Sequence, residues 1–286
     1  MPNTMRMTAG RLLPALVAAA LAALPAYGAD EQAKPGMATC LSVPGAIPGP
    51  KCKPTFDKLN ALLDAKDWGG LVRALSFGSD GEENMALLDW QQDAITSGRG
   101  GLLVSLAYAR NLWLVGSSQN AEDPARDLRM SSAMITLYAF ILIRVDGLEC
   151  QDSTSPSHRM DQLVQQQKDV LLFLASKPKE ARDHVISNAV AMEKLLAPHR
   201  EHNDELLCNG GMLAMMAGLM GGQQREVPTP PGHVGKTTDV VPPAGWKPAF
   251  LAPEVYEPAK AKARDDLQKT VEAFVDVMVK AAAPVN

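Results

Sequence analysis

Apolar residues recur every three or four positions along most of this chain, the spacing that places them on one face of an α-helix. The first stripe starts after Pro54 and consists of Phe56, Leu59, Leu62 and Leu63. Similar stripes predict helices over residues 68–77, 82–96, 102–115, 123–145, 155–175, 179–196, 204–220 and 259–283. We find no convincing alternation of apolar and polar residues, the pattern of a half-buried strand. The sequence therefore predicts an all-α protein.

The hydrophobic pattern predicts where the helices lie along the chain more closely than how they pack against each other. Met134–Ile143 is almost wholly apolar but shorter than the roughly 20 residues of a membrane span, so we expect the central buried helix there. Asp123-Pro124 is a capping residue followed by proline at the first helical position, which predicts where that helix begins. The glycine pairs 69–70, 100–101 and 210–211 each directly precede an apolar helical segment, and this weak repeat favours antiparallel helical hairpins, arranged either as a solenoid-like array or as an orthogonal bundle.

A proline-rich segment precedes the last helix. Residues 221–253 contain seven prolines and no helical periodicity, which predicts an extended strap. Trp246 and Phe250 are its apolar anchors, and burying each would stabilise the strap by about 2–3 kcal/mol. We expect both side chains to hold the strap on the helices or to contact a partner.

The N-terminus resembles an export signal. Arg6 and Arg11 precede a short apolar run, and Ala26-Tyr27-Gly28 offers small residues for cleavage before Ala29. We therefore expect a periplasmic or secreted protein with no integral membrane span in its mature chain. The predicted organisation is a signal peptide (1–28), an irregular arm (29–53), a helical domain (54–222), the strap (223–253) and a C-terminal helix that packs on the helical domain (254–286).

An oxidising compartment changes the interpretation of the cysteines. The four cysteines are even in number and contain no C-x-x-C pair, which favours two structural disulfides over a metal or redox site. Three pairings are possible, and we favour Cys40–Cys52 and Cys150–Cys208. The first pair would close a Pro/Gly loop, and the second would join the ends of helical segments.

Composition and charge exclude some functions. The chain has 286 residues, of which 46% are hydrophobic, and a net charge of −4 without a basic block. Nucleic acids and anionic membrane surfaces would therefore not attract it. Ser176-Lys177-Pro178-Lys179 matches an acylating motif only literally, because proline breaks the helix that the motif needs.

Two clusters carry ligand-type side chains. The stretch 199–205 contains His199, His202, Asp204 and Glu205, which could hold a divalent metal, although a solvated polar turn in which Asp204 caps the next helix is the simpler interpretation. Further along, Met212, Met215, Met216 and Met220 lie at helical spacing near Cys208. Thioethers suit Cu(I), but methionine commonly fills cores, so we expect a buried helix there.

Taken together, the sequence predicts an exported, disulfide-stabilised, helical binding protein of the cell envelope. Its partner would be an envelope or exported protein, and no cofactor is expected. No catalytic constellation is complete, which favours a protein that is not an enzyme. The alternative is an envelope hydrolase or metal-handling protein that uses the 199–205 cluster.

Overall fold

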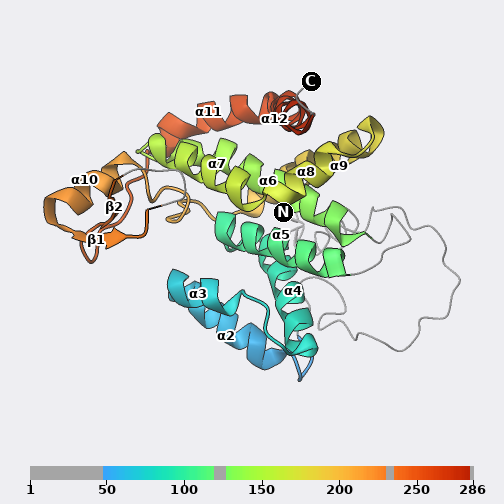
Figure 1. Ribbon diagram of the computed structural model, residues 1–286, viewed down its shortest axis with the longest axis horizontal. Coiled ribbons are helices and arrows are strands. Elements are labelled where there is room, and N and C mark those ends of the chain that lie inside the picture. Colours follow the sequence, from blue (N-terminus) through green and yellow to red (C-terminus); the bar gives the residue numbers. More distant parts are fainter. Residues whose placement is uncertain (1–47, 119–126, 230–234, 284–286) are drawn as a thin grey trace, which may run out of the picture.

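The structure is a computed structural model that describes residues 48–118, 127–229 and 235–283. Within these ranges the protein is mainly α, with eleven α-helices and one small antiparallel sheet (Figure 1). The predicted signal peptide and its cleavage site after Gly28 lie outside the described residues. So do Cys40 and most of the predicted arm, 29–53.

Within the described residues 48–118, four helices lie at positions that agree closely with the hydrophobic pattern. They are α2 (Lys53–Asp64), α3 (Trp68–Ala74), α4 (Gly81–Thr96) and α5 (Gly101–Ser118). Aspartates begin two of them, because the Asp67 carboxylate accepts from the N–H of Gly70 and Asp80 accepts from two N–H groups of α4. Phe56 and Leu59 of the first stripe are buried, as the spacing predicts.

The central buried helix is α6 (Leu128–Val145), and thirteen of its 18 residues are buried. It packs against α5, α7, α8 and α9, which surround it in the fold. The described part of the helix is capped by Asp127, which accepts from the N–H of Arg129, whereas the predicted cap at Asp123 lies outside the described residues. Among the described residues, only the segment Leu128–Glu149 is long and apolar enough to cross a bilayer, yet 72% of its most apolar 18-residue stretch is buried within the protein.

Two helices that the pattern predicts as continuous are each divided in two. The predicted helix 155–175 forms α7 (Thr154–Gln166) and α8 (Lys168–Ala175), and the predicted helix 259–283 forms α11 (Pro253–Asp265) and α12 (Leu267–Ala282). At the first break the buried Gln167 donates to the carbonyl of Leu106 on α5. Between the two pairs, α9 (Lys179–Leu196) has the predicted bounds. Two short 3-10 helices, η2 (Asp146–Glu149) and η3 (Ala197–His199), follow α6 and α9.

The largest differences from the prediction lie between residues 204 and 241. The predicted helix 204–220 is wrong in its first half, because residues 204–211 form turns and α10 spans only Met212–Gly221. The prediction of an all-α protein is wrong for the strap, which contains β1 (Gln223–Val227) and β2 (Thr237–Val241). These strands form an antiparallel hairpin in which Arg225 lies opposite Asp239. Neither strand alternates clearly in hydrophobicity, which is why the pattern missed them.

Candidate functional site on a methionine-rich arm

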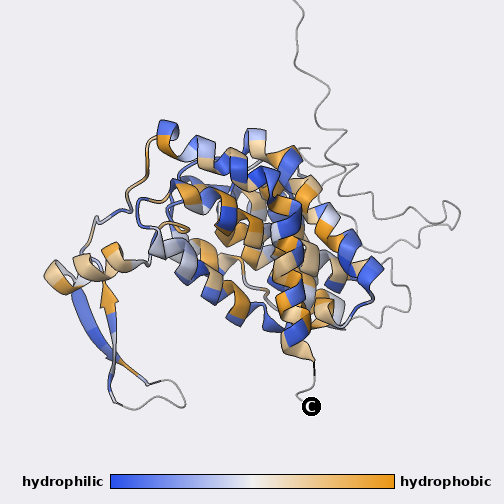
Figure 2. Cartoon of the chain, turned by 90° about the horizontal axis from the view of Figure 1, so that it is seen from above, coloured by the Kyte–Doolittle hydropathy of each residue, from blue (hydrophilic) through white to orange (hydrophobic). Residues whose placement is uncertain are grey.

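Helix α10 and the β1–β2 hairpin form an arm that extends from the helical body (Figures 1 and 2). We define the arm as residues 212–229 and 235–241. The main contacts of α10 are with β2 and β1. Six large apolar side chains on the helix are between 43% and 85% exposed: Met212, Leu213, Met215, Met216, Leu219 and Met220. The expectation of a buried methionine helix is therefore wrong.

The exposed side chains share one face of α10. At about 100° per residue, all six lie within an arc of roughly 160°, which we call the Met/Leu face. The opposite side carries Ala214 and Gly218, which are buried. A Cβ at Gly218 would lie 2.5 Å from Cγ1 of Val240 and 3.1 Å from the carbonyl oxygen of Val241. The small residues thus pack the helix on the hairpin, and the large ones face solvent.

The base of the arm is fixed by side chains from the beginning of α7. The N-cap of α10 is Gly211, which has no side chain to cap the helix. Instead, the Asp152 carboxylate accepts from the N–H of Leu213 at 2.7 Å, and Thr154 Oγ1 accepts from the N–H of Met212 at 2.8 Å. Thr154 Oγ1 also donates to Asp152 at 2.6 Å. We call Asp152 and Thr154 the remote cap, because they satisfy donors of a helix distant in sequence.

The remote cap favours a charged Asp152. Burial alone would raise the pKa of Asp152, but hydrogen bonds from Thr154 and from the N–H of Leu213 outweigh it and lower the pKa below its ordinary value. The carboxylate also lies at the positive end of the α10 dipole. The cap is therefore intact at neutral pH.

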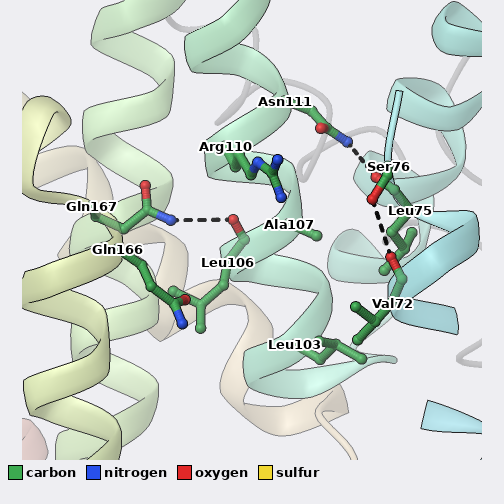
Figure 3. Close-up of a pocket in the computed structure, with 10 residues that line it drawn as sticks. All are labelled: Val72, Leu75, Ser76, Leu103, Leu106, Ala107, Arg110, Asn111, Gln166 and Gln167. Atoms are coloured by element: carbon green, nitrogen blue, oxygen red, sulfur yellow. Dashed lines mark hydrogen bonds between the residues drawn. The ribbon is translucent and has the colours of Figure 1, made fainter. Parts of the chain in front are cut away.

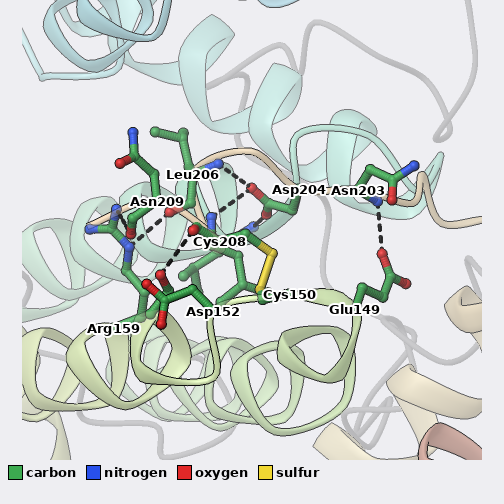
Figure 4. The surroundings of a disulfide bond; sticks show 12 residues. Glu149, Cys150, Asp152, Arg159, Asn203, Asp204, Leu206, Cys208 and Asn209 are labelled. Atoms are coloured by element: carbon green, nitrogen blue, oxygen red, sulfur yellow. Dashed lines mark hydrogen bonds between the residues drawn. A yellow bond between two sulfur atoms is a disulfide. The ribbon is translucent and has the colours of Figure 1, made fainter. Parts of the chain in front are cut away.

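A disulfide and an arginine hold the segment that leads into α10 (Figure 4). Cys150 and Cys208 are joined, with a Cα–Cα distance of 5.1 Å, which confirms the predicted pair. Ser155 Oγ donates to the carbonyl of Cys208, and the Arg159 guanidinium donates to the carbonyls of Leu206 and Asn209. The other predicted pair, Cys40–Cys52, includes a residue outside the described ranges and stays a prediction.

A cluster of buried charges lies close to the disulfide. Arg200 forms ion pairs with Asp146 at 2.7 Å and with Glu193 at 2.6 Å, and all three side chains are almost wholly buried. Lys260 on α11 pairs with Asp146 and with Glu149 of η2, and Arg264 on the same helix pairs with Glu193. The cluster holds η2, α9 and α11 together. Asp146 and Glu193 each pair with two cations, whereas removing Lys260 would take from the buried Glu149 its only lysine or arginine partner among the described residues.

The Glu149 carboxylate accepts hydrogen bonds from three different residues. It accepts from Lys260, from His202 Nδ1 at 3.0 Å and from the N–H of Asn203 at 2.8 Å. Burial alone would raise the pKa of Glu149, but the hydrogen bonds from His202, Lys260 and Asn203 lower it below its ordinary value. A charged Glu149 therefore stabilises the fold at neutral pH.

The four predicted metal candidates of the 199–205 cluster have separate surroundings. His199 is exposed at the end of η3, whereas His202 contacts Glu149. Asp204 accepts from the N–H groups of Leu206 and Leu207, so it caps a turn, and the prediction that it caps the next helix is wrong because α10 begins only at Met212. Asp204 also accepts from the N–H of Leu102 at the beginning of α5. Glu205 pairs with Lys66 at 2.7 Å. In the part of the chain that the structure describes, no three or more His, Cys, Asp and Glu residues form a group that could hold a metal.

The two aromatic anchors of the strap differ in their surroundings. Phe250 packs against the hydrophobic core and forms an isolated β-bridge with Cys150. The neighbouring Leu251 donates to the carbonyl of Glu149 at 2.8 Å, which ties this end of the strap to the body. Trp246 is half-buried in a turn in which its N–H donates to the carbonyl of Pro243.

A second surface feature is a groove between α3, α5 and the α7–α8 junction (Figure 3). Its volume is about 510 Å³, and Leu103, Leu106 and Ala107 of α5 lie along it. The exposed Arg110 is the charged residue of its lining. Two of its amide side chains are engaged in the fold, since Asn111 Nδ2 donates to the carbonyl of Leu75 and Gln167 donates to that of Leu106. This groove offers few free polar groups for a specific ligand.

The sequence reasoning missed the Met/Leu face. The segment Met212–Gly221 contains no charged or polar side chain. A helix that is apolar on all sides is usually buried, as α6 is, so this composition gave no sign that α10 would be exposed. The remote cap left no signal either, because Asp152 and Thr154 are about 60 residues away from the amides they bind.

Comparison with protein-family models, curated protein sequences and solved structures finds no significant match to this chain. Its function is therefore inferred from its own residues, and the Met/Leu face held out by the remote cap and the Cys150–Cys208 disulfide is the strongest candidate site.

Proposed function

We propose that this chain is an exported, disulfide-stabilised binding protein of the cell envelope and that it docks α10 into an apolar groove of a protein partner. The observation that carries this proposal is the exposure of six large apolar side chains on one helix face. Soluble proteins rarely expose contiguous apolar patches of more than a few hundred Å², and larger ones mark interaction sites. Export itself rests on the sequence pattern of residues 1–28.

The spacing on α10 supports a helix-in-groove mode of binding. Met212, Met215, Met216 and Leu219 occupy positions i, i+3, i+4 and i+7, the anchor pattern of helices that bind in apolar grooves. Methionine suits such a surface, because its flexible thioether adapts to irregular pockets. In this proposal, the antiparallel hairpins of the body, whether array or bundle, serve as the rigid support of the arm.

The available apolar area sets the affinity. Fully burying a large aliphatic side chain is worth about 1.5–3 kcal/mol, so covering six side chains whose exposed fractions average about one half returns roughly 5–9 kcal/mol in total. Before the cost of association, this corresponds at most to about micromolar binding. Tighter binding therefore needs polar contacts around the face in addition to the apolar area.

The charges of the arm favour a protein partner over a lipid surface. Helix α10 carries no charge, and the basic residues of the described hairpin are paired: Arg225 with Asp239 and Lys236 with Glu226. Interfacial membrane helices usually combine an apolar face with lysines and arginines that attract anionic headgroups. The described part of the arm lacks this combination.

Photo-crosslinking in living cells tests the proposal. Benzoylphenylalanine is introduced at Leu219 on the Met/Leu face and, as a control, at Val277, which is 56% exposed on α12. We expect a discrete protein adduct from position 219 and not from position 277, and we expect Met216→Asp to abolish it. Adducts to lipid alone, or binding of the purified protein to phosphatidylethanolamine/phosphatidylglycerol vesicles through this face, would overturn the proposal.

A further inference from the structure

We propose that the thioethers of Met212, Met215 and Met216 form a binding site for Cu(I) on α10. The inference goes beyond the docking function, because it depends on sulfur and not on apolar area. It starts from the chemistry of the Met/Leu face, which presents four thioethers within one short helix.

The spacing of these methionines brings three sulfurs within reach of one ion. Residues three and four apart are neighbours on a helix surface, with about 5–6 Å between their Cβ atoms. Met212 is therefore next to both Met215 and Met216, and each sulfur lies only two bonds beyond its Cβ on a flexible side chain. Met220 lies two turns from Met212, too far along the helix for both to bind the same ion. The geometry points to a three-sulfur set at the N-terminal half of α10.

The donors around this set select a soft monovalent ion. Thioethers prefer Cu(I), whereas hard divalent ions need carboxylate or imidazole ligands, and α10 contains neither. None of the described cysteines is a free thiol, so in this part of the chain no thiolate competes with the methionines. The three side chains are 43–49% exposed, so an ion reaches them without opening the core.

Competition against a chromophoric Cu(I) chelator measures the site. The purified full chain is titrated without oxygen, in the presence of ascorbate, into the Cu(I)–bicinchoninate complex, and loss of the complex colour reports transfer to the protein. We expect one Cu(I) per chain. We expect Met216→Leu to weaken binding at least about tenfold, because even indirect partners of metal ligands change affinity by roughly 10–100-fold. Met220→Leu is the matched control, and we expect it to bind as the original chain does.

A pair of variants separates this inference from the docking function. The triple variant Met212→Leu, Met215→Leu and Met216→Leu keeps the apolar face, so it should lose Cu(I) and retain the crosslinked partner. Conversely, Leu219→Asp should lose the partner and retain Cu(I). If the triple variant binds Cu(I) as tightly as the original chain, the thioether site is refuted and the docking proposal is untouched. An equal loss in Met220→Leu and Met216→Leu would refute the three-residue set.

Discussion

Removing the remote cap should loosen the arm and leave the helical body intact. In Asp152→Ala, the N–H of Leu213 loses its acceptor, and the negative charge at the beginning of α10 disappears. Loss of a helix cap costs about 0.5–2 kcal/mol, and the interaction of a charge with the helix dipole adds about 0.3–1 kcal/mol. If the local stability of α10 falls by about 1–2 kcal/mol in total, the equilibrium constant for its opening rises roughly 5–30-fold.

Hydrogen exchange followed by mass spectrometry reports this opening directly. Peptides that cover Met212–Gly221 should exchange roughly 5–30-fold faster in Asp152→Ala, whereas peptides from α6 should keep their rates. Thr154→Ser retains the hydroxyl that binds the N–H of Met212 and is the conservative control. Unchanged exchange in α10 would show that the cap does not hold the arm. Faster exchange throughout α6 would show instead that Asp152 stabilises the whole fold.

The same cap predicts a dependence on pH. The pKa of Asp152 is lower in the folded protein than in the unfolded chain, so its stabilisation is present above the unfolded value, about 3.9. As the pH falls below that value and through the folded pKa, the carboxylate is protonated and the stabilisation is lost. Protection of α10 should therefore decline in acid, and Asp152→Ala should remove this part of the pH dependence.

Three further predictions concern the body. Reducing the disulfide between Cys150 and Cys208, which are 58 residues apart, should lower the free energy of unfolding by about 4 kcal/mol, measured by denaturant titration with and without a reductant. Lys260→Met should lower the free energy of unfolding by about 3–5 kcal/mol, since it leaves the buried Glu149 without its lysine partner. The control Lys262→Met, at an exposed position of the same helix, should change it by less than about 0.5 kcal/mol. The pKa of Glu149 is lower in the folded protein than in the unfolded chain, so the stabilisation by its carboxylate should be present above the unfolded pKa of about 4.3 and should decline as the pH falls through the folded pKa. The melting temperature measured as a function of pH reports this loss, and a melting temperature that does not change between about pH 3 and pH 5 would contradict it.

The sequence predicted helix positions well wherever local periodicity and burial agree. Helix α9 has the predicted bounds, and Met134–Ile143 is the buried centre because its apolar residues on all sides require neighbours on all sides. The break at Gln167 was not predictable, because a buried glutamine looks like an ordinary polar position until the carbonyl of Leu106 is placed beside it. Helix breaks of this kind depend on tertiary contacts that no local pattern contains.

The candidate site was largely hidden for a similar reason. The pairing of Cys150 with Cys208 was predictable from the ends of helical segments, and it holds the base of the arm. Burial of α10 was inferred from composition alone, but exposure depends on what the fold places against a helix. Here Ala214 and Gly218 form the buried side of the helix, with Gly218 against Val240 of the hairpin, and the methionines stay outside.

The buried charges show the same limit of sequence reasoning. Arg200 and His202 belong to a stretch with the composition of a solvated turn, yet Arg200 is buried between Asp146 and Glu193. Its partners come from α9 and η2, and only the folded chain brings them together.

Methionine oxidation tests most directly whether the Met/Leu face is a docking surface. Dilute hydrogen peroxide converts accessible thioethers to sulfoxides, and peptide mass spectrometry measures the extent at each methionine. In the purified protein, Met216 and Met220 should be oxidised much faster than the buried Met134 and Met192. In intact cells, where the partner is present, Met216 should become protected relative to the purified protein. Equal oxidation of Met216 in cells and in isolation would contradict the account, and so would slow oxidation of Met216 in the purified protein.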